Sequence, residues 1–313
     1  FNTMNKTKVL FVAGRGRSGS TLMGNVLGQL DGYVNCGEII AMWDASIINR
    51  RNCGCGKPVR ECEFWAPVLT KAYGRVDDEL ARHMLNLRGN SMGRWHLPRL
   101  SMGIGRDKLL QISEPYRNEL AKLYRAIAEH TQCKVLVDVS KSAAYAYLLD
   151  QTPEIDLYTV HLVRDPRAVS YSWWKNAKAA TDKHREGEMD LKRRNPIETS
   201  LGWDILNTYI DRIWKRENKR YMFLNYETFT KSPRATIESI CKFVGEERPT
   251  SPFVADDELV MRPCHSCIGN PSRFVEGKTT KIRHDTKWET SIGGGMKLLC
   301  NVLTAPCRRR FGY

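Results

Sequence analysis

The sequence KVLFVAGRGRSGSTLMGNVLGQL, residues 8–30, combines the signals of a strand, a loop and a helix in that order. The apolar run 9–13 is typical of a buried parallel strand. A glycine-rich loop follows at residues 14–21, and apolar residues then recur at helical spacing from Leu22 to Leu30. Because glycines let a backbone approach a phosphate and the helix dipole adds positive potential, this stretch predicts an anion site.

The loop departs from the Walker signature G-x-x-x-x-G-K-[ST] at one position. Gly14, Gly19 and Thr21 match it, but Ser20 stands where the lysine belongs. Arg17 supplies the positive charge instead. A kinase without the lysine would lack its usual contact to the β- and γ-phosphates, so we expect a terminal 5′-phosphate that carries a transferable group. A P-loop kinase or related phosphotransferase is the main rival interpretation. A non-catalytic nucleotide- or polyanion-binding protein is a second.

The composition is that of a globular protein with an anionic partner. The chain has 313 residues, of which 42% are hydrophobic and 27% charged, and its formal net charge is +14. We see no apolar run long enough to span a membrane and no signal peptide, and we therefore expect a cytoplasmic protein. The basic residues are not interleaved with aromatic ones in a recognisable module, so nucleic-acid binding is not expected. The sequence leaves the oligomeric state open.

Ten cysteines are present, and three of them lie in an irregular insertion at residues 52–65. Cys53, Cys55 and Cys62 would need a fourth ligand to bind zinc, and their spacing lacks paired C-x₂-C knuckles and an obvious histidine. Cys264 and Cys267 form a second weak candidate, which could join the first only if the fold brought them together. We therefore interpret the cysteines as buried, reduced thiols and predict no metal site.

Strand and helix signals alternate along the chain. Further strands are expected at residues 33–34, 134–139, 156–163 and 221–225. Helices are expected at residues 39–48, 77–87, 114–130, 143 onward, 166–174, 197–217, 232–244 and 287–303. This order predicts an α/β fold, a parallel sheet with helices on both faces, in one domain over residues 1–313. Residues 88–106 lack periodicity and are interpreted as a lid or a wall of the acceptor pocket.

Chemically active side chains follow several of the predicted strands. Ligands of open α/β sheets bind at the carboxyl ends of the strands. Arg17, Lys141 and Arg164 would form a cationic pocket there around a polyanionic nucleotide. Ser172 lies two helical turns beyond Arg164 and can reach the same phosphate if a helix starts at Pro166.

Four segments, in order, resemble the sulfotransferases that use 3′-phosphoadenosine 5′-phosphosulfate (PAPS). GRGRSGSTLM resembles the 5′-phosphosulfate loop, and VRDPRAVSYS resembles the 3′-phosphate element. Tyr226 and Glu227 resemble the segment near the adenine, and GNPSRFVEGK resembles the loop that closes over the nucleotide. The resemblance implies a P-loop-like core, PAPS as donor and 3′-phosphoadenosine 5′-phosphate (PAP) as product. The donor-binding residues that it implies are Arg15, Gly16, Arg17, Ser18, Gly19, Ser20, Thr21, Arg164, Ser172, Tyr226, Arg273 and Lys278.

The segment Cys36–Gly37–Glu38 resembles the C-G-E segment of tyrosylprotein sulfotransferases, whose glutamate is the catalytic base. The resemblance thus implies Glu38 as base, with Arg17 and Lys141 stabilising the leaving group. The alternative bases are His96, His161 and His184. No metal is required, because a sulfuryl group carries less charge than a phosphoryl group. We expect the acceptor to be a hydroxyl or amine of a small metabolite or natural product. A glycan is the alternative.

Overall fold

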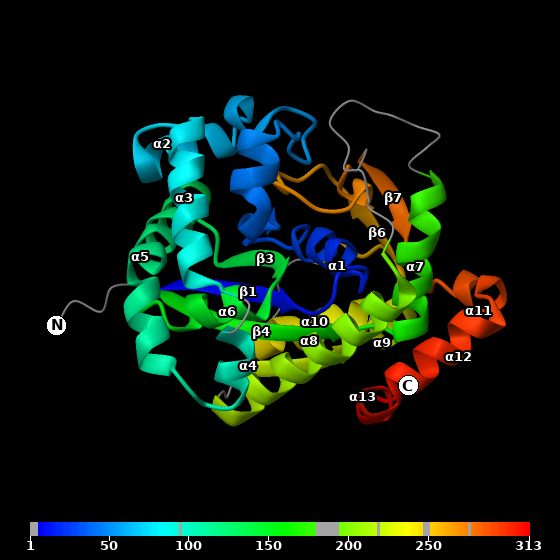
Figure 1. Cartoon of the computed structure of the whole chain (residues 1–313). Helices are drawn as coiled ribbons and strands as arrows, with labels where there is room; N and C mark the ends of the chain where they lie inside the picture. Colours follow the sequence, from blue (N-terminus) through cyan, green and yellow to red (C-terminus); the bar gives the residue numbers. More distant parts are fainter. Residues whose placement is uncertain (1–5, 94–95, 180–193, 218–219, 247–250, 275–276) are drawn as a thin grey trace.

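The computed structural model describes residues 6–93, 96–179, 194–217, 220–246, 251–274 and 277–313 (Figure 1). Its main sheet has five parallel strands in the order β2-β3-β1-β4-β5. They are β1 (Thr7–Ala13), β2 (Tyr33–Gly37), β3 (Val135–Lys141), β4 (Ile155–Val163) and β5 (Tyr221–Asn225). A second, antiparallel sheet pairs β6 (Glu258–Met261) with β7 (Lys278–Lys281).

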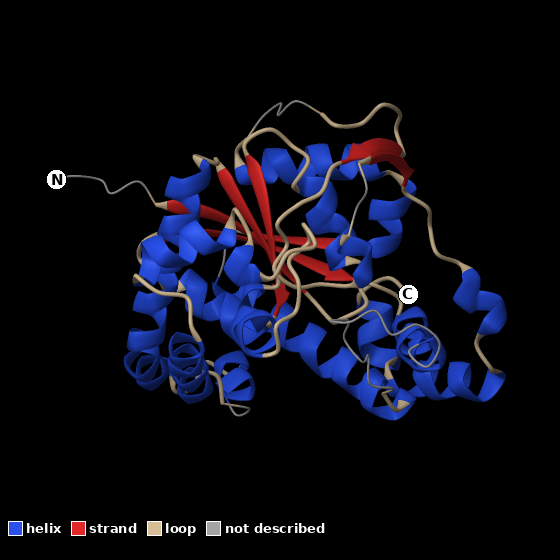
Figure 2. Cartoon of the chain, turned by 90° about the horizontal axis from the view of Figure 1, so that it is seen from above, coloured by secondary structure: helices blue, strands red, loops and turns tan. Residues whose placement is uncertain are grey.

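Helices cover both faces of the main sheet, which Figure 2 shows at the centre of the molecule. The long helices are α1 (Ser20–Leu27), α2 (Trp65–Tyr73), α3 (Asp78–Ser91), α5 (Arg106–Thr131), α6 (Ala143–Asp150), α7 (Pro166–Ala179), α8 (Pro196–Glu217), α10 (Pro233–Val244) and α12 (Gly294–Leu303). The shorter ones are α4 (His96–Ser101), α9 (Tyr226–Lys231), α11 (Lys287–Ser291), α13 (Ala305–Arg310), η1 (Ile39–Ala41), η2 (Met42–Ile48), η3 (Val59–Glu61) and η4 (Pro271–Arg273). The predicted α/β fold is confirmed.

Alternate residues of β1 enter two separate apolar cores. Val9 and Phe11 pack into a cluster with residues of α2, α3, α5, α6 and α8, whereas Leu10 and Val12 pack with residues of α1, α9 and α10. All four side chains are fully buried. Successive side chains of a strand point to opposite faces, so an uninterrupted apolar run places β1 in the middle of a sheet covered on both sides.

Two sequence predictions of local structure are wrong, and residues 88–106 are largely helical. They hold the end of α3, all of α4 and the start of α5, with residues 94–95 outside the described part, and their role as a lid or a wall of the acceptor pocket stays a prediction. The helix expected from residue 114 begins eight residues earlier and continues through Pro115. The tail helix expected at residues 287–303 is divided into α11 and α12 at Gly293, which has an extended backbone.

The strand order places the predicted phosphate loop, residues 14–21, at a point where the chain connections diverge. β1 pairs with β3 on one side, where Ala13 lies opposite Lys141, and with β4 on the other, where Ala13 lies opposite His161. Crossovers that leave on opposite sides of the sheet open a crevice at the carboxyl ends of such strands. Within the described residues, no helix is both long and apolar enough to cross a membrane.

Two helical glycines should respond in opposite ways to alanine. A Cβ atom at Gly24 of α1 would lie 2.8 Å from Val139 Cγ1 and 3.0 Å from Asn35 Oδ1, whereas at the exposed Gly89 of α3 it would meet nothing within 4 Å. Overpacking costs about 1–3 kcal/mol, and glycine to alanine in a helix gains about 1 kcal/mol. We expect Gly24→Ala to lower the free energy of unfolding by about 1 kcal/mol and Gly89→Ala to raise it by up to about 1 kcal/mol. Urea titrations measure both, and equal effects would contradict the close packing of α1 on β2 and β3.

Candidate active site

The loop between β1 and α1 curls tightly over the end of β4. Its backbone has positive φ at Gly14 (149°), Arg17 (76°) and Gly19 (91°). A Cβ atom at Gly14 would lie 2.4 Å from the carbonyl oxygen of Leu162, and one at Gly19 would lie 2.5 Å from the ring of Tyr226. Only glycine fits these two positions without strain. The loop is therefore fixed both by its own dihedral angles and by contact with β4 and α9.

Arg17 joins three segments that are distant in the sequence. Its Nε donates to Ser172 Oγ at 3.1 Å, and its Nη1 donates to Asn270 Oδ1 at 2.5 Å. The guanidinium also lies 5.6 Å from the ring centroid of Trp173. Burial, with the nearby charge of Arg164, lowers the pKa of Arg17 to about 10. The side chain thus remains a cation at neutral pH in surroundings that favour an anionic partner.

Arg164, directly after β4, lies beside Arg17. Its Nη1 donates to the carbonyl oxygen of Arg17 at 3.3 Å, and its Nη2 pairs with Asp285 at 2.9 Å. The guanidinium stacks over the ring of Tyr226 at 4.4 Å, and only 8% of the side chain is exposed. Arg164 and Ser172 both contact Arg17, in agreement with the sequence prediction that the three residues lie close together.

Lys141 and Glu38 form the second half of the site. Lys141 Nζ lies 2.5 Å from Glu38 Oε1, and both side chains are about four-fifths buried. Lys141 has a positive φ of 66°, and its carbonyl oxygen accepts a hydrogen bond from the N–H of Gly14 at 3.2 Å. The ends of β1 and β3 therefore place an acid–base pair directly beside the phosphate loop.

A buried carboxylate fixes the turn that carries Lys141. Asp138 accepts hydrogen bonds from the N–H of Ser140 at 2.8 Å and from the hydroxyl of Tyr124. Ser140 Oγ in turn accepts from the N–H of Ile40, two residues after Glu38, at 3.1 Å. Burial raises the pKa of Asp138 to about 6, although its hydrogen bonds oppose this. From the sequence, Asp138 belongs to the cluster at residues 138–141, but its contacts are not predictable, because a carboxylate in a strand gives no signal of its partners.

The covering segment, residues 267–273, lies over the loop at residues 14–21. The N–H of Asn270 donates to Thr21 Oγ1 at 3.3 Å, and Asn25 Nδ2 of α1 donates to the carbonyl oxygen of Ser272 at 3.1 Å. The buried Arg273 donates to the carbonyl oxygens of Gly269 at 2.7 Å and Asn52 at 3.3 Å. Arg273 thus holds the segment in place. Asn270 lies in the stretch GNPSRFVEGK, but the sequence does not predict its contact with Arg17.

Some predicted site residues lie elsewhere. Arg15 packs against α8, where a Cβ atom at Gly202 would lie 2.7 Å from its guanidinium. Lys278 lies on the exposed strand β7. Other predicted residues do lie at the site. Ser18 of the loop is buried, as are Ser20 and Thr21, the first two residues of α1. A Cβ atom at Gly16 would lie 3.2 Å from Trp173.

The alternative bases have other surroundings. His161 is fully buried between Tyr221 and Asn207 at 2.8 and 3.0 Å, and burial lowers its pKa to about 4. His96 contacts the carbonyl oxygen of Ser91 at 3.1 Å, and His184 lies outside the described residues. Glu38 is the candidate that forms an ion pair with Lys141.

Comparison with known proteins gives consistent results. A family model described as "Sulfotransferase domain" matches residues 7–268. The human protein carbohydrate sulfotransferase 3 (Homo sapiens) is 25% identical over 177 residues, which cover 53% of this chain and 35% of that protein. The matched part thus spans about a third of this relative's length.

Of two solved structures that match this chain, the first shares its fold. The sulfotransferase domain from the Synechococcus PCC 7002 olefin synthase has 18% sequence identity and a TM-score of 0.53, covering 100% of this chain and 97% of its own. The sulfotransferase domain from the curacin biosynthetic pathway has 13% identity and a TM-score of 0.47, and the match covers 95% of this chain and 98% of that domain's chain.

The buried Asp138 should make stability depend on pH in a known direction. Its pKa rises from 3.8 to about 6 on folding, so deprotonation between these values favours the unfolded state. We expect the stability of Asp138→Asn relative to the wild type to rise as the pH increases from about 4 to about 6, and then to level off. Urea unfolding at a series of pH values measures this difference. A constant difference, or one that falls, would show that burial does not raise this pKa.

Proposed function

The chain belongs to the sulfotransferase domain family, and we propose on this premise that it moves the sulfuryl group of PAPS to an acceptor hydroxyl. The chain is a sulfotransferase with an α/β fold. We also propose that residues 1–313 form one domain.

The observation that carries the proposed donor is the contact of Arg17 with Ser172. It joins the loop that would bind the 5′-phosphosulfate to the helix that would bind the 3′-phosphate. Ser18 Oγ in the loop and Nε of Arg164 are among the buried polar atoms of the described residues that have no hydrogen-bond partner. A ligand with two separate phosphates fits this arrangement, because each phosphate offers several strong acceptor oxygens. The site therefore fits PAPS better than a nucleotide with one phosphate chain.

The residues of the other half supply the chemistry. Transfer breaks the bond between sulfur and the bridging oxygen of the 5′-phosphate and forms a bond from sulfur to the acceptor oxygen. The hydroxyl proton passes to the carboxylate of Glu38, and PAP leaves with the additional negative charge. Lys141, Arg17 and the loop N–H groups would stabilise that charge. The ion pair between Lys141 and Glu38 holds base and cation together at the end of β3.

The acceptor class is a separate proposal. The name of the human relative, carbohydrate sulfotransferase 3, favours a carbohydrate hydroxyl, although the match covers 53% of this chain. A small metabolite or natural product remains the other candidate, as expected from the sequence. A panel of oligosaccharides and small hydroxyl compounds, assayed for transfer from labelled PAPS, distinguishes the two classes.

Calorimetric titration with PAP tests the donor. We expect binding to the wild type, and binding about 10–100-fold weaker in Arg164→Ala, because a hydrogen bond to a charged group contributes about 1.5–3 kcal/mol. Arg167→Ala is the matched control, since this arginine lies three residues farther along, in the first turn of α7, and pairs with Asp165 at 2.5 Å. Binding of ATP with Mg²⁺ in place of PAP would favour the kinase interpretation and contradict the proposal.

Replacement of the proposed base should affect chemistry more than binding. We expect Glu38→Gln to lower the single-turnover rate by about 100-fold or more, with PAP affinity nearly unchanged. Asp44→Asn is the control, because Asp44 pairs with Arg88 at 3.5 Å rather than with Lys141. The rate is measured with labelled PAPS and an acceptor that the panel of compounds identifies. A wild-type rate in Glu38→Gln would exclude this carboxylate as the base.

A further inference from the structure

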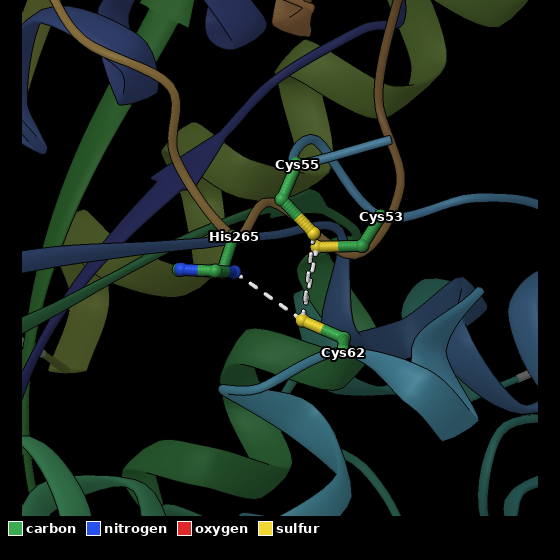
Figure 3. Close-up of side chains that lie close together, drawn as sticks. All are labelled: Cys53, Cys55, Cys62 and His265. Atoms are coloured by element: carbon green, nitrogen blue, oxygen red, sulfur yellow. Dashed lines mark hydrogen bonds between the residues drawn. The ribbon is translucent and has the colours of Figure 1, made fainter. Parts of the chain in front are cut away.

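The insertion at residues 52–65 meets a histidine that is distant in the sequence. Cys53, Cys55 and Cys62 converge with His265, and the four ligand atoms all lie within 4.8 Å of one another (Figure 3). Cys62 Sγ lies 3.7 Å from Cys53 Sγ, 3.6 Å from Cys55 Sγ and 3.2 Å from His265 Nδ1. His265 is thus in position to be the fourth ligand, which the sequence near the three cysteines does not reveal.

We propose that Cys53, Cys55, Cys62 and His265 bind one Zn²⁺ ion. In a regular tetrahedron with zinc–sulfur bonds of about 2.3 Å and zinc–nitrogen bonds of about 2.05 Å, neighbouring sulfurs lie about 3.8 Å apart and sulfur and nitrogen about 3.6 Å apart. The sulfur–sulfur separations of 3.6 and 3.7 Å agree with these values, and the sulfur–nitrogen separation of 3.2 Å is shorter than the ideal one. Three thiolates and one imidazole fill all four positions, which is typical of structural rather than catalytic zinc.

The four side chains are shielded from solvent. Cys53 and Cys62 are fully buried, and Cys55 and His265 are partly buried. A closed site of this kind is typical of structural zinc.

The histidine is fixed in its own way. The ring of His265 stacks on Phe64 with centroids 5.2 Å apart, and its carbonyl oxygen accepts from Trp65 Nε1 at 2.6 Å. Both the ring and the backbone of His265 are therefore oriented by residues that directly follow Cys62, as expected for a ligand held by its outer shell.

Zinc at this position would fasten the covering segment to the active-site edge. Directly after His265, the N–H of Cys267 donates to the carbonyl oxygen of Cys36 at 3.0 Å, and the N–H of Glu38 donates to that of Ile268 at 3.1 Å. Two residues farther, Asn270 accepts from Arg17. The ion would thus fix a short segment that contacts both the proposed base and the phosphate loop. The binding of zinc itself does not depend on the proposed function.

The metal content of the chain tests the proposal. We expect tag-free protein, purified without added metal and analysed by plasma mass spectrometry, to contain about one zinc per chain. Cys62→Ser and His265→Ala should each lose most of it. Cys133→Ser, which replaces a half-buried cysteine outside the cluster, should keep it. Wild-type protein without zinc, or with a disulfide between two of the three cysteines, would overturn the proposal, as would zinc retained in both variants.

Hydrogen exchange tests the structural role without an activity assay. Removal of zinc from the wild type with a strong chelator should accelerate exchange at the amides of Glu38 and Cys267, whose hydrogen bonds hold the covering segment. Amides in the middle of α10, such as that of Ile240, should exchange as before, because α10 packs in a different core from the one that contains Cys53 and Cys62. Unchanged exchange at Glu38 and Cys267, with zinc removed, would show that the ion does not fix this segment.

Discussion

The hydrogen bonds of Arg17 are the interaction on which the site depends. One guanidinium holds the phosphate loop, α7 and the covering segment together through Ser172 and Asn270. It can do so because Gly14 and Gly19 allow the loop to turn where any larger residue would collide with Leu162 or Tyr226. The order of the strands then places Lys141 on one side of this loop and Arg164 on the other. A loop, a sheet edge and a distant segment thus form one cationic surface.

Packing several cations together requires anions close by. Arg17 has a lowered pKa because it is buried and lies near Arg164. Asp285 forms an ion pair with Arg164, and Glu38 forms one with Lys141. A nucleotide phosphate would compete with protein oxygens for these groups. The same arrangement explains why a proposed base lies within an ion pair, since Glu38 both neutralises Lys141 and faces the edge where sulfuryl transfer would occur.

Local patterns in the sequence predicted what they encode locally. The apolar runs of β1, β4 and β5 and the loop before α1 are decided by neighbouring residues, and these predictions are confirmed. The helix start at Glu114 was wrong, because α5 begins at Arg106 and continues through Pro115, and Arg117 donates to the carbonyl oxygen of Leu110 at 3.0 Å. His265 was missed as a partner of Cys62 because 203 residues separate them. Asp285 and Asn270 were missed for the same reason.

A crystal structure of the complex with PAP tests the central claim most directly. We predict the 5′-phosphate over residues 14–21 with Arg17 and Lys141 as ligands, and the 3′-phosphate on Arg164 and Ser172. The contact between Arg164 and Asp285 should then be weakened or replaced. A nucleotide bound away from the phosphate loop, or one whose 3′-phosphate does not touch Arg164, would contradict the account of how this edge of the sheet binds its donor.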